Sequence, residues 1–328
     1  MIISRTPMRI SLFGGGTDFP KWYKENGGAV INGSINKYTF INIRNLPPFF
    51  DFKYCIRYYN REETNNINSI KHPSVKACLN FLKVKKGIEI VHNADLPAMS
   101  GLGTSSSFTV GLLNAIYALQ GKYVTKKELA YNAIEVEQNI IKEAVGSQDQ
   151  VASAFGGLNK IEFNGEDITV NPLILNKNRL EQLETSLLLY FTGLQRDAKK
   201  IEADKIKNIF KKNIELEEMQ ILTNEAFKYL TSSRKNFDDL GLLLNEQWKL
   251  KKSLSSKVTN NKIDQIYKEA IKAGALGGKL LGAGAGGFIL FYVNKNKLNN
   301  VKKKLDKLLN VPFRFDFTGS QIIYYSQS

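Results

Sequence analysis

The chain has 328 residues, of which 43% are hydrophobic and 23% are charged, and this composition excludes a disordered chain, a collagen and a disulfide miniprotein. No apolar run approaches the roughly 20 residues that a bilayer span needs, and the start lacks the apolar stretch of a signal peptide, so we expect a cytoplasmic protein with no membrane partner. The net charge of +15 indicates an acidic partner, which could be nucleic acid, anionic lipid or a phosphorylated small molecule.

The first half of the chain is predicted to contain strands first and helices after them. Thr125 and Glu128 form a capping box, which marks the start of a helix at 126. The spacing of apolar residues predicts strands at 2–12, 30–43 and 88–92, helices at 107–119, 126–142 and 148–156, and short strands at 158–163 and 168–170.

Polar residues at 171–184 indicate a linker that divides the chain into units 1–180 and 181–328. The second unit begins with an apolar strand at 187–191. It continues with helices at about 198–230, 237–254 and 262–273, a glycine cluster, a strand at 288–293, a helix at 298–309 and a last strand at 322–325. This order of elements predicts an α+β fold.

Three glycine-bearing segments are candidates for a ligand site. The first runs from Thr6 to Pro20 and contains Gly14-Gly15-Gly16-Thr17-Asp18 a few residues after Arg9. A carboxylate and an arginine beside backbone without side chains can hydrogen-bond a polyhydroxylated ligand. The same residues could equally form a tight loop with a turn-forming Asp.

The second segment, Pro97 to Ser107, lies directly before a predicted helix. Unpaired amides and the helix dipole make such a position favourable for an anion, and the hydroxyls can donate to phosphate or coordinate Mg²⁺. The Gly-Lys-Ser/Thr ending of a P-loop is missing. We interpret the segment as a phosphate-binding loop, with a serine-rich helix cap as the alternative.

The third segment, Gly277 to Phe288, contains a G-x-G-x-x-G pattern at Gly282, Gly284 and Gly287. A dinucleotide fingerprint follows a strand and opens a helix, whereas this segment follows a predicted helix and leads into a strand. Close backbone packing under the phosphate-binding loop accounts better for so many glycines.

Carboxylates complete the set of candidate polar residues. Glu135 and Glu137 lie on the predicted helix at 126–142, where a solvated surface is the ordinary alternative, and Asp149 lies near a helix start. The two histidines, His72 and His92, have no cysteine or histidine at ligand spacing. A zinc site and a serine-histidine triad are therefore poorly supported.

The three segments in this order, with Asp149 in a Gly-x-x-Asp-Gln setting between the second and third, resemble the GHMP kinases, a superfamily that includes galactokinase, homoserine kinase and mevalonate kinase. The resemblance covers nearly the whole chain. It implies an N-terminal α+β domain with a left-handed βαβ crossover, a ferredoxin-like C-terminal domain and a site in the cleft between them.

The resemblance also implies roles for individual residues, with ATP and Mg²⁺ as cofactors. Asp149 would be the catalytic carboxylate, and Ser105 and Glu137 would hold the Mg²⁺. The ATP-binding residues would be Pro97, Ser100, Gly101, Leu102, Gly103, Thr104, Ser105 and Ser106. The substrate-binding residues would be Arg9, Gly15, Gly16, Thr17, Asp18, Lys37, Arg44, Arg196 and Gly284.

The first segment departs from the galactokinase pattern Gly-Glu-His-Thr-Asp, because Asp18 is kept while Gly15 replaces the Glu. Loss of a carboxylate removes repulsion toward an anionic substrate and leaves more room. This version resembles the branch that phosphorylates the anomeric hydroxyl of D-glycero-D-manno-heptose 7-phosphate in GDP-heptose synthesis, and L-fucokinases share much of it. Arg9, Lys37 and Arg44 could hold the sugar phosphate.

We therefore expect an ATP-dependent sugar kinase with a sugar phosphate as substrate, which could form a homodimer. The alternatives are an L-fucokinase or another sugar 1-kinase, an NAD-dependent oxidoreductase and a nucleic-acid-binding protein. Residues 1–180 carry 21 basic against 15 acidic side chains, and residues 181–328 carry 25 against 16. The charge forms no basic arm or tail, which disfavours nucleic acid as the partner.

Overall fold

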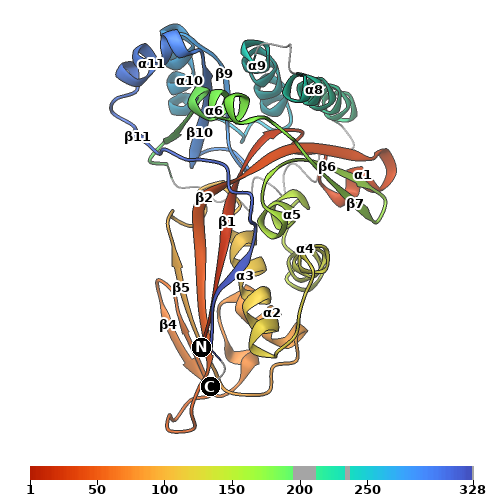
Figure 1. Cartoon of the computed structure of the whole chain (residues 1–328), viewed down its shortest axis with the longest axis vertical. Helices are drawn as coiled ribbons and strands as arrows, with labels where there is room; N and C mark the ends of the chain where they lie inside the picture. Colours follow the sequence, from red (N-terminus) through yellow and green to blue (C-terminus); the bar gives the residue numbers. More distant parts are fainter. Residues whose placement is uncertain (195–211, 233–236, 327–328) are drawn as a thin grey trace.

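The computed structural model describes residues 1–194, 212–232 and 237–326, which build two β-sheets with helices packed on them. Figure 1 shows an elongated molecule in which the first sheet occupies one end and the second sheet the other. Met1 and Ser326, the first and last described residues, lie together at the far end of the first sheet. Among the described residues, no helix is long and apolar enough to cross a bilayer.

The first sheet is built on two long antiparallel strands, β1 (Ile2–Phe13) and β2 (Gly28–Asn45). Its strand order is β12-β1-β2-β5-β3-β4, and two further strands extend it along the first part of β2. The other members are β3 (Tyr54–Arg57), β4 (Arg61–Thr64), β5 (Ile88–Ala94), β6 (Leu158–Asn164), β7 (Asp167–Pro172) and β12 (Gln321–Tyr325). The strands predicted in this half of the chain are confirmed, while β3 and β4 were not predicted.

Helices cover one face of this sheet in Figure 1. They are α1 (Pro20–Asn26), α2 (Pro73–Phe81), α3 (Thr104–Leu119), α4 (Lys126–Ile134) and α5 (Gln148–Phe155), with a 3₁₀ turn at Ile67–Ser69. The capping box of Thr125 and Glu128 is confirmed. The helix that it opens continues as a π-helix over Glu135–Ile140 instead of reaching residue 142 as an α-helix. β3, α2 and β5 form a βαβ unit with parallel strands.

The second sheet has the strand order β11-β8-β10-β9, and all its neighbours are antiparallel. This is the ferredoxin-like order, in which the third strand lies between the first and second, so the expected C-terminal fold is confirmed. Its strands are β8 (Leu187–Phe191), β9 (Ala275–Leu280), β10 (Phe288–Val293) and β11 (Leu309–Asn310). Its helices are α6 (Lys177–Ser186), α8 (Asn213–Thr231), α9 (Asp238–Ser253), α10 (Asn261–Ala273) and α11 (Leu298–Lys304), with a 3₁₀ turn at Lys295–Lys297.

Three details of the prediction for this half were wrong. The expected linker at 171–184 contains helix α6, which begins after the Asn176 cap and buries Leu183. The glycine segment follows strand β9 and not a helix, because Ala275–Leu280 pairs with β10. Helix α11 ends at Lys304, short of residue 309. The predicted helix at about 198–230 lies partly outside the described residues, and its described part is α8.

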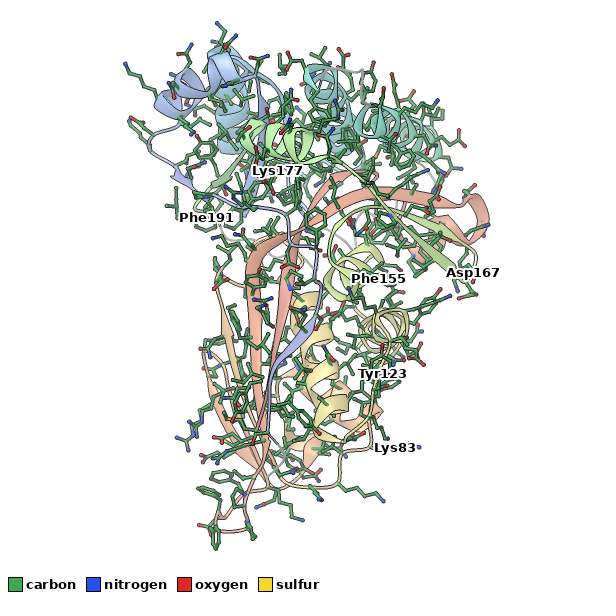
Figure 2. All side chains as sticks on the ribbon, in the orientation of Figure 1. Lys83, Tyr123, Phe155, Asp167, Lys177 and Phe191 are labelled. Carbon is green, nitrogen blue, oxygen red and sulfur yellow. The ribbon has the colours of Figure 1, made fainter. Side chains whose placement is uncertain are left out.

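Apolar packing joins the two ends of the molecule. One core cluster contains Met8 and Ile10 of β1 together with Leu189 of β8 and Phe288 of β10. In Figure 2, side chains fill the space between the sheets and their helices, whereas Tyr123 and Lys177 project from the outside. Strand β12 pairs with β1, so the end of the chain returns to the first sheet. We propose that the two units divide near residue 180, with β12 assigned to the first.

Candidate active site

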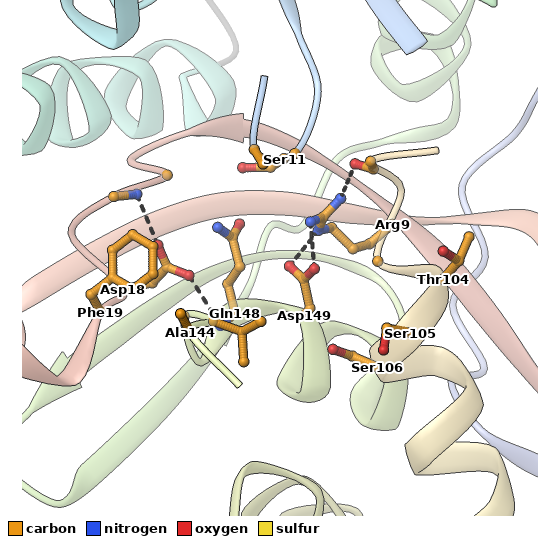
Figure 3. A pocket seen from close by; sticks show the side chains of 18 of the residues that line it. Arg9, Ser11, Asp18, Phe19, Thr104, Ser105, Ser106, Ala144, Gln148 and Asp149 are labelled. Atoms are coloured by element: carbon orange, nitrogen blue, oxygen red, sulfur yellow. Dashed lines mark hydrogen bonds and ion pairs between the residues drawn. The ribbon is translucent and has the colours of Figure 1, made fainter. Parts of the chain in front are cut away.

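A pocket of about 280 Å³ is lined by residues from both units. The first unit contributes residues within 9–19, 99–106 and 143–149, and the second contributes Lys251, Lys279, Gly282 and Ala283. Figure 3 shows Asp18, Gln148 and Asp149 along one wall, with Arg9 next to Asp149 and the hydroxyl residues Thr104, Ser105 and Ser106 at the start of α3. The first two glycine segments and Asp149 therefore meet at one site.

Helix α3 presents its amino end to this pocket. Its N-cap residue is Gly103, which has φ +72° and makes no side-chain cap, and the first turn contains no acidic residue. Gly101, Thr104 and Ser105 line the pocket beside it. Uncapped amides at the positive end of a helix are suited to phosphate oxygens. The alternative interpretation as a serine-rich helix cap is not supported, because no side chain caps α3 and the Ser106 hydroxyl donates to Glu137 at 2.8 Å.

The third glycine segment packs directly against the backbone of the phosphate-binding loop. A Cβ atom on Gly287 would lie 2.1 Å from the Ser100 carbonyl oxygen, and the Phe288 N–H donates to that oxygen at 3.2 Å. A Cβ on Gly284 would lie 2.6 Å from Cα of Val258. The segment is the turn between antiparallel β9 and β10 and opens no helix, so the dinucleotide-binding interpretation is not supported.

Arg9 and Asp149 form a bidentate ion pair in the pocket. Nε of Arg9 donates to Oδ1 of Asp149 at 2.7 Å and Nη2 donates to Oδ2 at 2.6 Å, while Nη1 donates to the Gly101 carbonyl oxygen at 2.8 Å. The side chain of Arg9 is 4% exposed and that of Asp149 is 23% exposed. Arg9 therefore fixes the orientation of the Asp149 carboxylate and ties it to the phosphate-binding loop.

Asp18 is held by the loop that carries it. Its Oδ1 accepts from the Gly16 N–H at 2.8 Å, and its Oδ2 accepts a longer bond from the Gln148 N–H at 3.4 Å. Gly15 and Gly16 line the pocket with it. Thr17 is fully buried and its hydroxyl donates to the Gly14 and Ala29 carbonyl oxygens, so it supports the loop and lies outside the pocket wall.

Glu137 lies behind the phosphate-binding loop. It is fully buried, and its Oε2 accepts from the Ser106 hydroxyl and from the Gln150 amide. Burial raises the pKa of Glu137 to about 7, although the hydrogen bonds from Ser106 and Gln150 act in the opposite direction. Its Oε1 has no hydrogen-bond partner within the described part of the chain. A carboxylate oxygen in need of a partner and neighbouring hydroxyls fit a hard cation such as Mg²⁺.

Ser105 and Glu137 are not in contact, however. Ser105 and Ser106 both line the pocket, but Glu137 bonds to Ser106. Ser105 is exposed and Ser106 is buried, so the accessible hydroxyl and the hydroxyl that contacts the carboxylate belong to different residues.

Several other expected ligand-binding residues lie away from the pocket. Arg44 pairs with Glu89 on β5. On strand β2 it lies twelve positions, about 40 Å of extended strand, from Asn32, which is the partner of the pocket residue Ser11 in the β1–β2 ladder. Lys37 lies on the same strand and is not part of the pocket wall. Pro97 is exposed, Leu102 is buried in the core, and both are outside the wall. Arg196 lies outside the described residues.

The pocket also contains residues that the sequence analysis missed. Lys251 donates to the Leu280 and Gly282 carbonyl oxygens at 2.7 and 2.6 Å, and Lys279 donates to the Leu12 carbonyl oxygen at 2.9 Å. Both lysines are at least 95% buried. Lys251 gave no local signal, because a single lysine on a helix is ordinarily a surface residue. Lys279 stands in the third glycine segment, which was interpreted only as packing under the loop. Ser11, Gln148 and Glu143 also line the pocket.

Comparison with protein families finds two matches. The model of the GHMP kinases N terminal domain matches residues 71–157, and the model of the GHMP kinases C terminal region matches residues 226–311. The first range includes the phosphate-binding loop and Asp149, and the second includes the glycine turn under that loop.

Individual relatives agree with these matches. The chain is 35% identical to the D-glycero-α-D-manno-heptose 7-phosphate kinase of Campylobacter jejuni, over 97% of this chain and 96% of that one. It is 27% identical to the L-fucokinase/L-fucose-1-P guanylyltransferase of Bacteroides fragilis, over 88% of this chain and 34% of that protein.

Solved structures show the same fold. A D-glycero-D-manno-heptose 1-phosphate kinase from Bacteroides thetaiotaomicron has a TM-score of 0.81 at 24% identity, with both chains covered completely. A sugar kinase structure from Campylobacter jejuni has a TM-score of 0.70 at 30% identity, with 98% of each chain covered.

Proposed function

The chain belongs to the GHMP kinase family and is an ATP-dependent phosphotransferase for sugar substrates, and we propose that its acceptor is D-glycero-D-manno-heptose 7-phosphate, phosphorylated at the anomeric hydroxyl. The product would be the 1,7-bisphosphate, which nucleotide-activated heptose synthesis requires. The observation that carries this proposal is the 35% identity to a heptose 7-phosphate kinase along 97% of the chain.

The pocket supports a phosphorylated acceptor in two ways. Gly15 brings no side chain into the pocket beside Asp18, so no carboxylate at that position repels an anion. Lys251 and Lys279 place two positive charges in the wall, held there by backbone carbonyl oxygens. These two lysines take the place of Lys37 and Arg44 as the candidates for holding the substrate phosphate.

In the proposed reaction, Asp149 orients the attacking hydroxyl of the sugar and accepts its proton. Arg9 keeps the carboxylate in place through two parallel hydrogen bonds, so no reorientation is needed when the sugar binds. Asp18 lies on the same wall, and in this proposal it accepts hydrogen bonds from other sugar hydroxyls.

The phosphate-binding loop and the start of α3 position the nucleotide. Their amides and the hydroxyls of Thr104 and Ser105 would donate to phosphate oxygens and stabilise charge on the transferring phosphoryl group. Mg²⁺, when bound, would neutralise phosphate charge, and Glu137 with the adjacent serine hydroxyls of α3 would hold it.

The experiment that tests the substrate measures ADP release over a panel of sugars and sugar phosphates. We expect the highest kcat/KM with D-glycero-D-manno-heptose 7-phosphate and weak activity with the unphosphorylated heptose. Higher kcat/KM with L-fucose or another neutral sugar than with any sugar phosphate would contradict the heptose assignment and leave only the GHMP sugar kinase activity.

A further inference from the structure

Two polar side chains in the pocket have no role in the reaction described above. Ser11 is 5% exposed and Gln148 is 8% exposed, yet both line the pocket. The Ser11 hydroxyl oxygen and Oε1 of Gln148 have no hydrogen-bond partner among the residues that the structure describes. A buried polar atom without a partner costs about 1–3 kcal/mol, so a position that retains two of them calls for an explanation.

Both side chains face the same small region of the pocket. Figure 3 shows the Gln148 side chain between Asp18 and Asp149, with its amide directed toward Ser11. An added Cβ on Gly15 would lie 3.3 Å from Oγ of Ser11 and 3.5 Å from Nε2 of Gln148. Gly15 thus borders the space that these two polar groups share.

The glycine at position 15 is not required by its backbone. Its φ is not in the left-handed region, and within the described part of the chain only the ends of the two polar side chains lie close to an added Cβ. The backbone could therefore carry a side chain, which would fill the space between Ser11 and Gln148. Keeping a glycine here leaves that space to a ligand.

A third polar residue lies behind this region. Asn32 is directly opposite Ser11 in the β1–β2 ladder, is fully buried, and has no partner for either amide atom among the described residues. Directly opposed residues of antiparallel strands place their side chains on the same face of the sheet. The region is therefore rich in uncharged donors and acceptors, which match alcohol groups, since a hydroxyl both donates and accepts.

We propose that Ser11, Gly15 and Gln148 form a subsite that binds the hydroxyl-bearing carbon arm of the acceptor outside the sugar ring and selects sugars that possess such an arm. This inference rests on the proposed function, because it assumes a sugar with its reacting hydroxyl at Asp149. Ser11 and Gln148 are specificity residues in this arrangement. Gly15 contributes by leaving the volume that the arm occupies.

The test is direct binding measured by titration calorimetry without ATP. The probes are D-glycero-D-manno-heptose 7-phosphate and D-mannose 6-phosphate, which carry the same phosphate but differ by one hydroxyl-bearing carbon. Gln148→Met, Ser11→Ala and Gly15→Ala should each raise the Kd of the heptose probe about tenfold, as expected for a lost hydrogen bond or a blocked volume. The Kd of the hexose probe should change less than twofold.

Ser153→Ala is the matched control, because Ser153 is also fully buried and its hydroxyl has no partner among the residues described, but it lies outside the pocket wall. It should leave both Kd values unchanged. Thermal unfolding shows whether each variant is folded, and Gly15→Ala tests the subsite without removing any polar group.

Equal loss of affinity for both probes, or heptose affinity within twofold of the wild type in all three variants, would overturn the subsite. So would a wild type that binds neither probe. A wild type that binds the heptose probe, loses this affinity in the variants and yet releases no ADP with any sugar would overturn the proposed function and retain the subsite.

Discussion

At the scale of single residues, the proposed chemistry depends on the ion pair of Arg9 and Asp149. Asp149→Asn keeps the size of the side chain and removes its charge, so both proton acceptance and the pairing with Arg9 are lost. We expect kcat to fall at least about 10²-fold with little change in ATP affinity. Steady-state kinetics with a saturating sugar substrate measures this, and a variant with near-normal kcat at neutral pH would exclude Asp149 as the catalytic carboxylate.

The adjacent serines of α3 make a second residue-scale prediction. Ser105 lines the pocket, so Ser105→Ala should raise the Mg²⁺ concentration for half-maximal rate at least fivefold if its hydroxyl is a metal ligand. Ser106 is buried and donates to Glu137, so Ser106→Ala should mainly lower thermal stability. Activity titrations with Mg²⁺ and melting curves separate the two effects. Equal Mg²⁺ requirements in both variants would rule out this division of roles.

At the scale of elements, the glycine turn between β9 and β10 should control the phosphate-binding loop. In Gly287→Ala the added Cβ would meet the Ser100 carbonyl oxygen at 2.1 Å, which forces the loop to move. We expect the KM for ATP to rise at least tenfold and the melting temperature to fall. Gly121→Ala is the control, because Gly121 has a similar positive φ of +68° but no described residue within 4 Å of an added Cβ.

That pair of variants separates backbone strain from the contact, since both carry the cost of a left-handed alanine. If Gly121→Ala and Gly287→Ala lower stability equally and neither changes the KM for ATP, then the turn does not support the loop. ATP kinetics and thermal melts of the two variants provide the comparison.

The elements also show what local patterns could predict. The strand at 2–12, the capping box at Thr125 and the helix before Gly156 depend on residues close in sequence, and they are confirmed. The return of β12 to β1 and the π-helix at Glu135–Ile140 depend on packing between distant segments, which periodicity does not contain.

The same distinction holds for the site. Asp18, Asp149 and the phosphate-binding loop stand in compact motifs, and the structure brings them to one pocket. Lys251 and Lys279 reach that pocket only because α9 and β9 pack against the end of β1. Nothing near Lys251 in the sequence distinguishes it from a surface lysine, whereas Lys279 stands in the third glycine segment, whose glycines were interpreted as packing under the loop and not as part of the pocket wall. Lys37 and Arg44 were chosen for charge and closeness in sequence, but an extended strand separates residues by about 3.3 Å each.

At the scale of the whole molecule, the buried Glu137 and the half-buried His92 change the pH dependence of stability in opposite directions. Burial raises the pKa of Glu137 to about 7, and burial with nearby His72 lowers the pKa of His92 to about 4. The ordinary values are 4.5 for Glu and 6.5 for His. Compared with the unfolded state, the folded state therefore holds an extra proton at Glu137 between pH 4.5 and about 7, and it lacks a proton at His92 between about pH 4 and 6.5.

The two contributions have opposite slopes with pH. The contribution of Glu137 is fully present below pH 4.5 and is lost as the pH rises through about 7, whereas that of His92 is present above pH 6.5 and is lost as the pH falls through about 4. Each shift corresponds to about 3 kcal/mol in the free energy of unfolding. In the protein without nucleotide or Mg²⁺, the two should largely cancel between pH 4.5 and 6.5.

Single variants should show the separate pH dependence that each group gives to the free energy of unfolding. Relative to the wild type, the free energy of unfolding of His92→Gln should decrease as the pH rises from 4.5 to 6.5, because the loss at Glu137 is no longer compensated. Glu137→Gln should show the opposite trend, since only the gain at His92 remains. Urea unfolding at several pH values measures both differences, which are informative because other carboxylates contribute equally to variant and wild type. Parallel profiles for all three proteins would mean that neither group titrates as its burial requires.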